Sequence, residues 1–276
     1  MDSAARVILA ILLGFMGRIA LAADPVAFVS DMKGDVVLDG GGRPAFLAEL
    51  LPGSRLALGP EASASVMYVV SGDEYGLRGP GEFVVARDSV TAEKGAAPVR
   101  RHPPLRPSAI VLVQMSKAAT ASLRMRGSLA PRRDSVSVPY PSGGKISTLQ
   151  PTLRWVGDAN LPYSVAVISS AGKEVFRGTV KGTSLAVPTR LVAGQSYSWS
   201  HVAPDGTTGE ARFETLAADG MKTAEKARGA AKSFTDRVRL AVLLEELGAS
   251  QESRQVWAQL SAERPEIPEL GGLARP

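Results

Sequence analysis

The chain has 276 residues, of which 45% are hydrophobic and 21% are charged, a composition typical of a folded protein with one large domain or two small ones. The absence of cysteine excludes a disulfide scaffold, thiolate catalysis and cysteine-based metal sites. Because His102 and His201 are the only histidines, a multi-histidine metal centre is excluded as well, and we expect neither a metal nor a cofactor. The 28 glycines and 19 prolines favour short strands and turns over long helices.

Residues 1–22 have the pattern of a secretory signal peptide. Arg6 precedes an apolar run at 7–16, and Ala20 and Ala22 are the small residues expected before a cleavage site, so we expect cleavage before Ala23. The alternative is a retained membrane anchor, but this run is too short to span about 30 Å of hydrocarbon as a helix. We therefore expect a periplasmic protein with no stable membrane span once the signal is removed.

Residues 23–95 predict a small β-sandwich or roll, because short apolar segments alternate with glycine-rich turns. The predicted strands are 27–29, 35–38, 64–70 and 82–86. This pattern is also compatible with a generic β module that has frequent turns and belongs to no particular family.

The order of four motifs in this module resembles that of a FecR domain. The motifs are KGDVV at 33–37, LLPGSRL at 50–56, ASVMY at 64–68 and YGLRGPG at 75–81. The resemblance implies an extracytoplasmic β module related to membrane regulators of sigma factors, which carry a cytoplasmic segment before their single membrane span. The signal begins at residue 1 with no such segment, so we expect only the extracytoplasmic module to carry over.

The formal net charge of +5 is concentrated in the segment 96–149, a predicted connector between two modules. From Lys94 to Arg133 the chain has nine lysines and arginines and no acidic residue, which predicts a surface that faces anions. The candidate contact residues are Arg100, Arg101, Arg106, Arg124, Arg126, Arg132 and Arg133. For an exported protein, we expect an anionic envelope polymer such as peptidoglycan or lipopolysaccharide, or an envelope protein, rather than nucleic acid. The alternative is a solvated linker.

The connector also contains predicted short strands. Its prolines favour an extended first part, and the apolar run 109–114 predicts a strand that returns to the first module. Alternation at 122–127 predicts a half-buried edge strand.

Residues 150–217 predict a second β-sandwich, from strands at 151–155, 163–168, 174–177, 185–188, 195–199 and 209–213. The order PTLRW, YSVAV, LVAGQSYSW and GEARF resembles bacterial fibronectin type III or immunoglobulin-like modules. We expect Trp155, Tyr163, Tyr197 and Trp199 to pack in the core, with a carbohydrate-stacking platform at Trp155 or Trp199 as the alternative. His201 is expected to be hydrogen-bonded or solvated.

Residues 218–276 predict a helical tail, with helices at 218–232 and 234–247 and a third that Ser250 caps and that ends before Pro265. The spacing of Leu240, Leu244, Gly248, Ser253, Trp257 and Pro265 resembles one degenerate tetratricopeptide repeat, which implies that Trp257 and Leu260 pack inside the helix pair. The alternative that we favour is a helical hairpin docked on the second sandwich, because a single repeat cannot form a solenoid.

The sequence contains no catalytic motif that we recognise. The loop SGGK at 142–145 lacks the other positions of a phosphate-binding loop, and the adjacent carboxylates Asp73 and Glu74 are expected on the solvated surface. We therefore expect a non-catalytic, mainly β protein of the bacterial envelope that binds a polymer or protein. The alternative function is the extracytoplasmic component of a FecR-type transmembrane signalling pathway.

Overall fold

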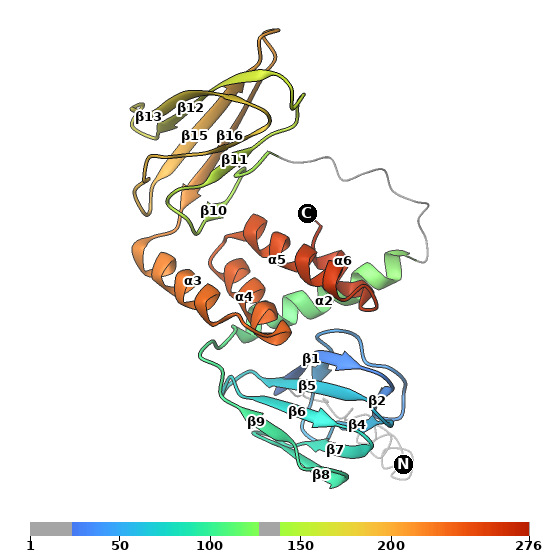
Figure 1. The fold of residues 1–276 in the computed structure, drawn as a ribbon. Coiled ribbons are helices and arrows are strands. Elements are labelled where there is room, and N and C mark those ends of the chain that lie inside the picture. The colour runs from blue at the N-terminus through green and yellow to red at the C-terminus, as the bar shows by residue number, and fades with distance from the viewer. Residues whose placement is uncertain (1–23, 127–138, 276) are drawn as a thin grey trace, which may run out of the picture.

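A computed structural model describes residues 24–126 and 139–275, and the side chains of 122–126 lie outside this description. The described parts of the chain form three layers, with one β module at each end and helices between them (Figure 1). The predicted fold class, mainly β with a C-terminal helical segment, is confirmed. The predicted signal peptide falls outside the described residues.

Within residues 24–101, antiparallel strands form two open sheets. One sheet has the order β3-β1-β5-β6-β9, with β1 Ala27–Lys33, β3 Glu49–Leu50, β5 Ser63–Tyr68, β6 Glu74–Arg78 and β9 Val99–Arg101. The other has the order β2-β4-β7-β8, with β2 Val36–Leu38, β4 Arg55–Leu58, β7 Gly81–Val85 and β8 Val90–Lys94. Each predicted strand of this module overlaps one of these elements.

Side-chain alternation and turn chemistry explain these elements. In β4, Leu56 and Leu58 are buried while Arg55 is exposed, as expected for a strand with one face on the core. Gly34 has φ of +72°, and a Cβ at this position would lie 3.0 Å from Cα of Ala62. The turn between β1 and β2 therefore requires glycine.

The segment predicted as short strands at 109–114 and 122–127 forms helix α2 (Ala109–Arg126) instead, and Gly127 lies outside the described residues. Its β-branched and apolar residues favoured a strand locally. However, the buried positions Leu112, Ser116 and Ala119 are spaced four and three residues apart, which is the period of a helix. Packing against neighbouring helices overrides the local preference.

The second module, within residues 139–217, has the predicted sandwich-like arrangement of strands. Its larger sheet has the order β10-β16-β15-β12-β13, with β10 Lys145–Ile146, β12 Pro162–Ser169, β13 Glu174–Lys181, β15 Ser196–Val202 and β16 Thr208–Thr215. A two-stranded sheet pairs β11 (Thr152–Arg154) with β14 (Ser184–Ala186). All the strands predicted here overlap these elements.

The aromatic residues of the second module lie in its core, as expected. Trp155 is 5% exposed and Trp199 is 1% exposed, so the alternative of a carbohydrate-stacking platform on either ring is wrong. His201 departs from expectation, because it is buried and its Nδ1 has no hydrogen-bond partner in the described part of the chain. Its ring stacks on Trp155 with centroids 5.1 Å apart.

The helical layer contains the three predicted helices and a short additional one. They are α3 (Ala218–Ala230), α4 (Phe234–Glu246), α5 (Ser250–Glu263) and α6 (Pro268–Leu273). Trp257 and Leu260 are completely buried. The predicted cap is wrong, because Ala249 is the N-cap of α5 and Ser250 Oγ donates to Glu245 Oε1 instead.

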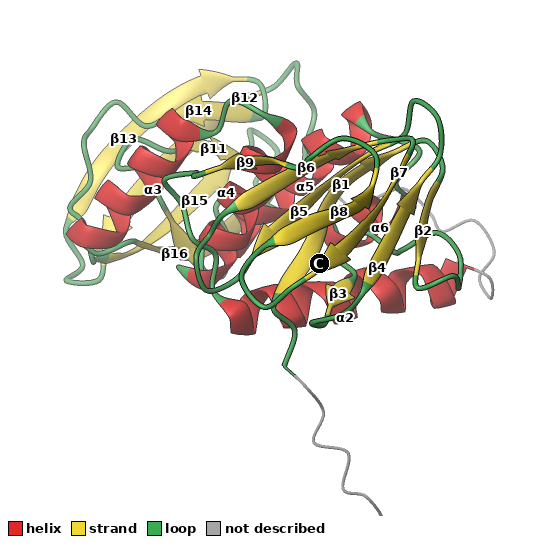
Figure 2. Cartoon of the chain, turned by 90° about the horizontal axis from the view of Figure 1, so that it is seen from below, coloured by secondary structure: helices red, strands yellow, loops and turns green. Residues whose placement is uncertain are grey.

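The helices share their core with the first module, whereas the sequence predicted that they dock on the second. Val238, Trp257 and Leu270 belong to the same hydrophobic cluster as the strand residues of the first module. Phe46 packs edge-on against Trp257, with ring centroids 6.0 Å apart. Seen from below, α2 runs beside the strands of this module (Figure 2). The second module has its own core, formed among its described residues by residues between 140 and 213.

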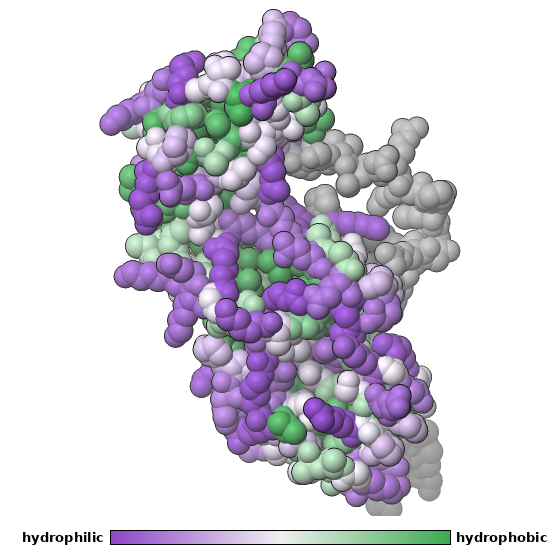
Figure 3. All heavy atoms as spheres, viewed as in Figure 1, coloured by the Kyte–Doolittle hydropathy of each residue, from purple (hydrophilic) through white to green (hydrophobic). Residues whose placement is uncertain are grey.

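Hydrophilic residues are spread over all three layers on the face seen in Figure 3. Among the helices that the structure describes, none has the length and apolar character needed to cross a membrane. Buried apolar residues of the helices pack in one cluster with those of the first module.

Candidate functional site

Two of the predicted contact residues, Arg100 and Arg101, lie on β9 at the edge of the first module. This strand pairs antiparallel with β6, and the register places Arg101 opposite Glu74. The pairing therefore brings connector arginines next to the adjacent carboxylates Asp73 and Glu74. These carboxylates were expected on the solvated surface, but Asp73 is 3% exposed and Glu74 is 7% exposed.

Arg101 links β9 to both the first module and the helical layer. Its Nη2 donates to Glu74 Oε2 at 2.8 Å, and its Nη1 donates to Asp236 Oδ2 at 3.0 Å. Asp236 belongs to the capping box with Ser233 at the start of α4. Burial opposes ionisation of Asp236, but hydrogen bonds from Arg101 and Ser233 outweigh it and lower the pKa of this carboxyl.

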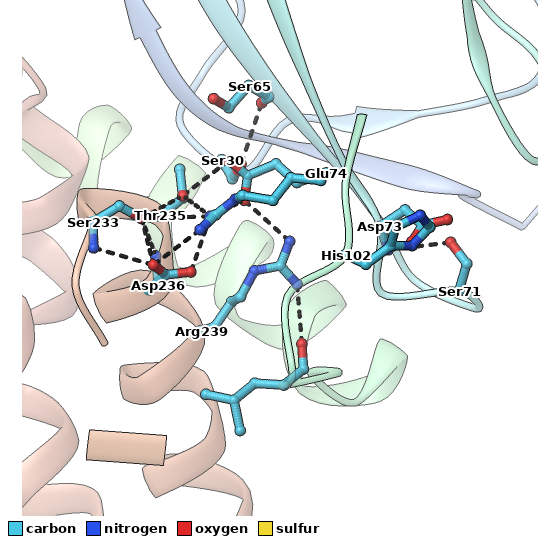
Figure 4. A network of polar contacts seen from close by, with 12 residues as sticks. Ser30, Ser65, Ser71, Asp73, Glu74, His102, Ser233, Thr235, Asp236 and Arg239 are labelled. Carbon is cyan, nitrogen blue, oxygen red and sulfur yellow. Dashed lines mark hydrogen bonds and ion pairs between the residues drawn. The ribbon is translucent and has the colours of Figure 1, made fainter. Parts of the chain in front are cut away.

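Glu74 is the centre of this junction (Figure 4). Its Oε1 accepts from Thr235 Oγ1 at 3.0 Å, and its Oε2 accepts from Arg239 Nη2 at 3.2 Å as well as from Arg101. The Arg239 side chain is fully buried, its Nη1 donates to the Leu105 carbonyl at 3.2 Å, and its Nε has no partner among the residues that the structure describes. Burial lowers the pKa of this guanidinium, and the charge of Glu74 counteracts that effect.

Asp73 forms a neighbouring group with Arg100 and His102. Arg100 donates to Asp73 Oδ2 from Nε at 3.1 Å and from Nη2 at 2.6 Å, and His102 Nδ1 lies 2.5 Å from Asp73 Oδ1. Burial would raise the pKa of Asp73, but these hydrogen bonds, that of Arg100 first, hold it below its ordinary value. Asp73 is thus held as a carboxylate.

The remaining predicted contacts do not join this group. Arg106 is exposed, and its Cγ would lie 2.5 Å from a Cβ added at Gly72. Arg124 and Arg126 are in α2 with side chains outside the description, and Arg132 and Arg133 lie outside the described residues. Arg100 and Arg101 direct their charge toward carboxylates of their own chain.

A second charged junction, which the sequence did not predict, joins α5 to the second module. Glu252 is buried and accepts from Arg228 Nη2 at 2.6 Å and from the Ser147 backbone N–H at 2.9 Å. Tyr140 Oη donates to the same carboxylate at 3.2 Å, and burial together with the charge of Glu252 raises the pKa of Tyr140. A periodicity in the sequence carries no signal for this contact, because Ser147 and Glu252 are 105 residues apart.

In both junctions, the charged side chains hold the helical layer to a β module. Each buried carboxylate described above accepts hydrogen bonds from an arginine, so its charge is compensated where it lies. Within residues 24–126 and 139–275, no group of three or more histidine, aspartate or glutamate side chains is placed to hold a metal ion. The junctions fix how the helical layer meets each β module.

No protein-family model matches the chain, and no curated protein matches it. The resemblances to FecR, fibronectin type III and tetratricopeptide modules therefore rest on the motifs of the sequence.

Proposed function

We propose that this chain is an exported, non-catalytic protein of the bacterial envelope that binds an envelope polymer or protein. One observation carries the proposal: the helical layer is fastened to each β module by a buried charge cluster, at Glu74 and at Glu252. The modules are then presented in one arrangement to a partner that contacts more than one of them.

The cost of burying charge supports a role for this fixed arrangement. Moving charges out of water costs free energy. Well-packed apolar residues of similar size in place of a buried ion pair are often no less stabilising. Buried ion pairs instead require one geometry, because an arginine without its carboxylate is strongly disfavoured in the interior. Two such clusters at module boundaries favour a protein whose function depends on the relative orientation of its parts.

The envelope assignment is supported by the sequence. The signal-peptide pattern of 1–22 directs export, and a chain without cysteine is suited to an oxidising compartment because it has no thiol to oxidise. The FecR-like order of motifs between 33 and 81 points to the same location.

The test is retention of the mature chain, from residue 23 onward, by purified envelope polymers. We expect the chain to sediment with peptidoglycan sacculi or to bind lipopolysaccharide, more weakly at high salt, and to release no soluble fragments from the polymer. Absence of retention by sacculi, lipopolysaccharide and an envelope protein extract would overturn the binding proposal. Release of soluble fragments would overturn its non-catalytic part.

A further inference from the structure

The second module has an open pocket on its outer face, with a volume of about 840 Å³. It lies beside the turn between α4 and α5 and is separate from both charged junctions. The polar side chains that line it are those of Lys145, Ser169, Ser170, Ser196, Tyr197, Ser198, Arg212 and Glu214, and the hydroxyls of Ser169 and Tyr197 are bonded to the backbone of the same module.

Strand geometry places these groups on one face. In β15, Tyr197 and Trp199 are buried in the core, so Ser196 and Ser198 point to the outer face of the sheet. The register of β15 with β16 sets Ser198 opposite Arg212 and Ser196 opposite Glu214, and side chains of such pairs are neighbours. The pocket floor is therefore a row of hydroxyls beside a guanidinium.

Most of the side-chain donors of this pocket are free in the part of the chain that the structure describes. Among the described residues, the guanidinium of Arg212 and the hydroxyls of Ser170, Ser196 and Ser198 have no hydrogen-bond or ion-pair partner. Lys145 lies 4.0 Å from Glu214 at side-chain exposures of 45% and 42%, a weak pairing in water. In contrast, each arginine of the two charged junctions forms an ion pair with a carboxylate.

The pocket also reaches the helical layer. The Lys145 backbone N–H donates to the Gly248 carbonyl at 3.1 Å, and Gly248 forms part of the pocket wall. A molecule bound here contacts the second module at the point where it meets the helices. The pocket thus depends on the arrangement that the Glu252 junction maintains.

We propose that this pocket binds an anionic sugar, a class of ligand that follows from the proposed function together with the lining chemistry. The planar fork of Arg212, with Lys145 nearby, matches a carboxylate or phosphate. Serine hydroxyls donate and accept, as sugar hydroxyls do, and Glu214 accepts from a sugar hydroxyl or amide. Because the tryptophans are buried, recognition here uses charge and hydrogen bonds rather than ring stacking.

Titration of the mature chain with soluble probes, followed by NMR or calorimetry, tests this assignment. The probes are a muramic-acid disaccharide with a free carboxylate, a hexosamine phosphate, and a neutral N-acetylglucosamine disaccharide. The first two separate a carboxylate source from a phosphate source. We expect at least one anionic sugar to bind, about tenfold more tightly than the neutral one, because charge-assisted hydrogen bonds are the strong ones.

Matched variants locate the binding. Arg212→Gln is expected to weaken anionic-sugar binding about tenfold, and Arg212→Lys by less, because lysine keeps the charge without the fork. Lys181→Gln removes the same charge from an exposed position of β13 in the same sheet and is expected to change nothing. Both positions are exposed, and unchanged thermal unfolding verifies that each of the three variants folds.

The outcomes separate this assignment from the function on which it rests. If the Lys145→Gln, Arg212→Gln double variant still sediments with sacculi as the parent does, the envelope function stands and the pocket assignment is overturned. Equal binding of neutral and anionic sugars also overturns it. If an acidic peptide without sugar binds as tightly as the sugar probes, the pocket recognises a protein anion, and the sugar assignment is overturned.

Discussion

At the scale of single residues, the buried arginine of α4 depends on one carboxylate. Arg239 has Glu74 as its ion-pair partner among the described residues, and removing one member of a buried pair leaves an uncompensated charge. We expect Glu74→Ala to lower the free energy of unfolding by about 3–5 kcal/mol. Urea denaturation of the variant and the parent measures this difference in the free energy of unfolding.

An exposed pair of the same module is the control for that change. Glu82 and Lys94 are ion-paired at 2.8 Å with side-chain exposures of 45% and 71%, so Glu82→Ala should cost no more than about 1 kcal/mol. Equal losses for the two variants would show that burial of Glu74 contributes nothing to its importance.

His201 makes the stability of the second module depend on pH. Burial lowers the pKa of this imidazole, whereas an unfolded histidine binds a proton near pH 6.5. The unfolded state therefore binds more protons below that pH. The stability contributed by the neutral His201 side chain is thus complete above about pH 6.5 and is lost as the pH falls. We expect the parent to lose more stability between about pH 7 and pH 5 than His201→Phe does. Parallel pH profiles of the two melting temperatures would contradict this.

At the scale of elements, the sequence predicted the strands and helix ends that depend on local alternation and turn residues. The strands of both modules have apolar residues on one face, and Gly248 follows the end of α4 with a positive φ. Helix α2 was mistaken for strands because β-branched residues favour strands until tertiary packing decides. The buried position of Glu74 could not be predicted either, since its partner Arg239 is 165 residues away.

The two descriptions of 109–114 make opposite predictions for its side chains. In a strand, Ile110 and Leu112 would share a face, but in α2 Leu112 is completely buried and Ile110 is 71% exposed. We expect Leu112→Ala to cost about 2–5 kcal/mol and Ile110→Ala less than about 0.5 kcal/mol in chemical denaturation. Similar costs at both positions would support the strand.

At the scale of the whole molecule, the net charge of +5 conceals internal pairing. The connector is basic, yet its arginines at 100 and 101 are bound to the carboxylates of Asp73, Glu74 and Asp236, so this part of the connector joins the first module to the helices and is not a free surface. The guanidinium of Arg212, which has no partner among the described residues, lies instead in the second module. The segment with the densest positive charge is therefore not the segment whose charge is available for binding. Only the fold shows which charges are available.

The arrangement of the modules can be tested through the junction at Glu252. Glu252→Ala leaves Arg228 and the Ser147 N–H without their carboxylate, and hydrogen bonds to a charged group contribute about 1.5–3 kcal/mol each. We expect hydrogen exchange at Ser147 to accelerate at least about tenfold, while Val66, in the core of the first module, keeps its protection.

Ser250→Ala is the control for this change, because it removes a hydroxyl from the same helix whose bond goes to Glu245 instead. If the second module is held in place by the charge cluster, only Glu252→Ala should accelerate exchange at Ser147 and weaken retention by the envelope polymer. Retention that persists while exchange accelerates would mean that binding needs one module alone, and the fixed arrangement would then serve stability rather than recognition.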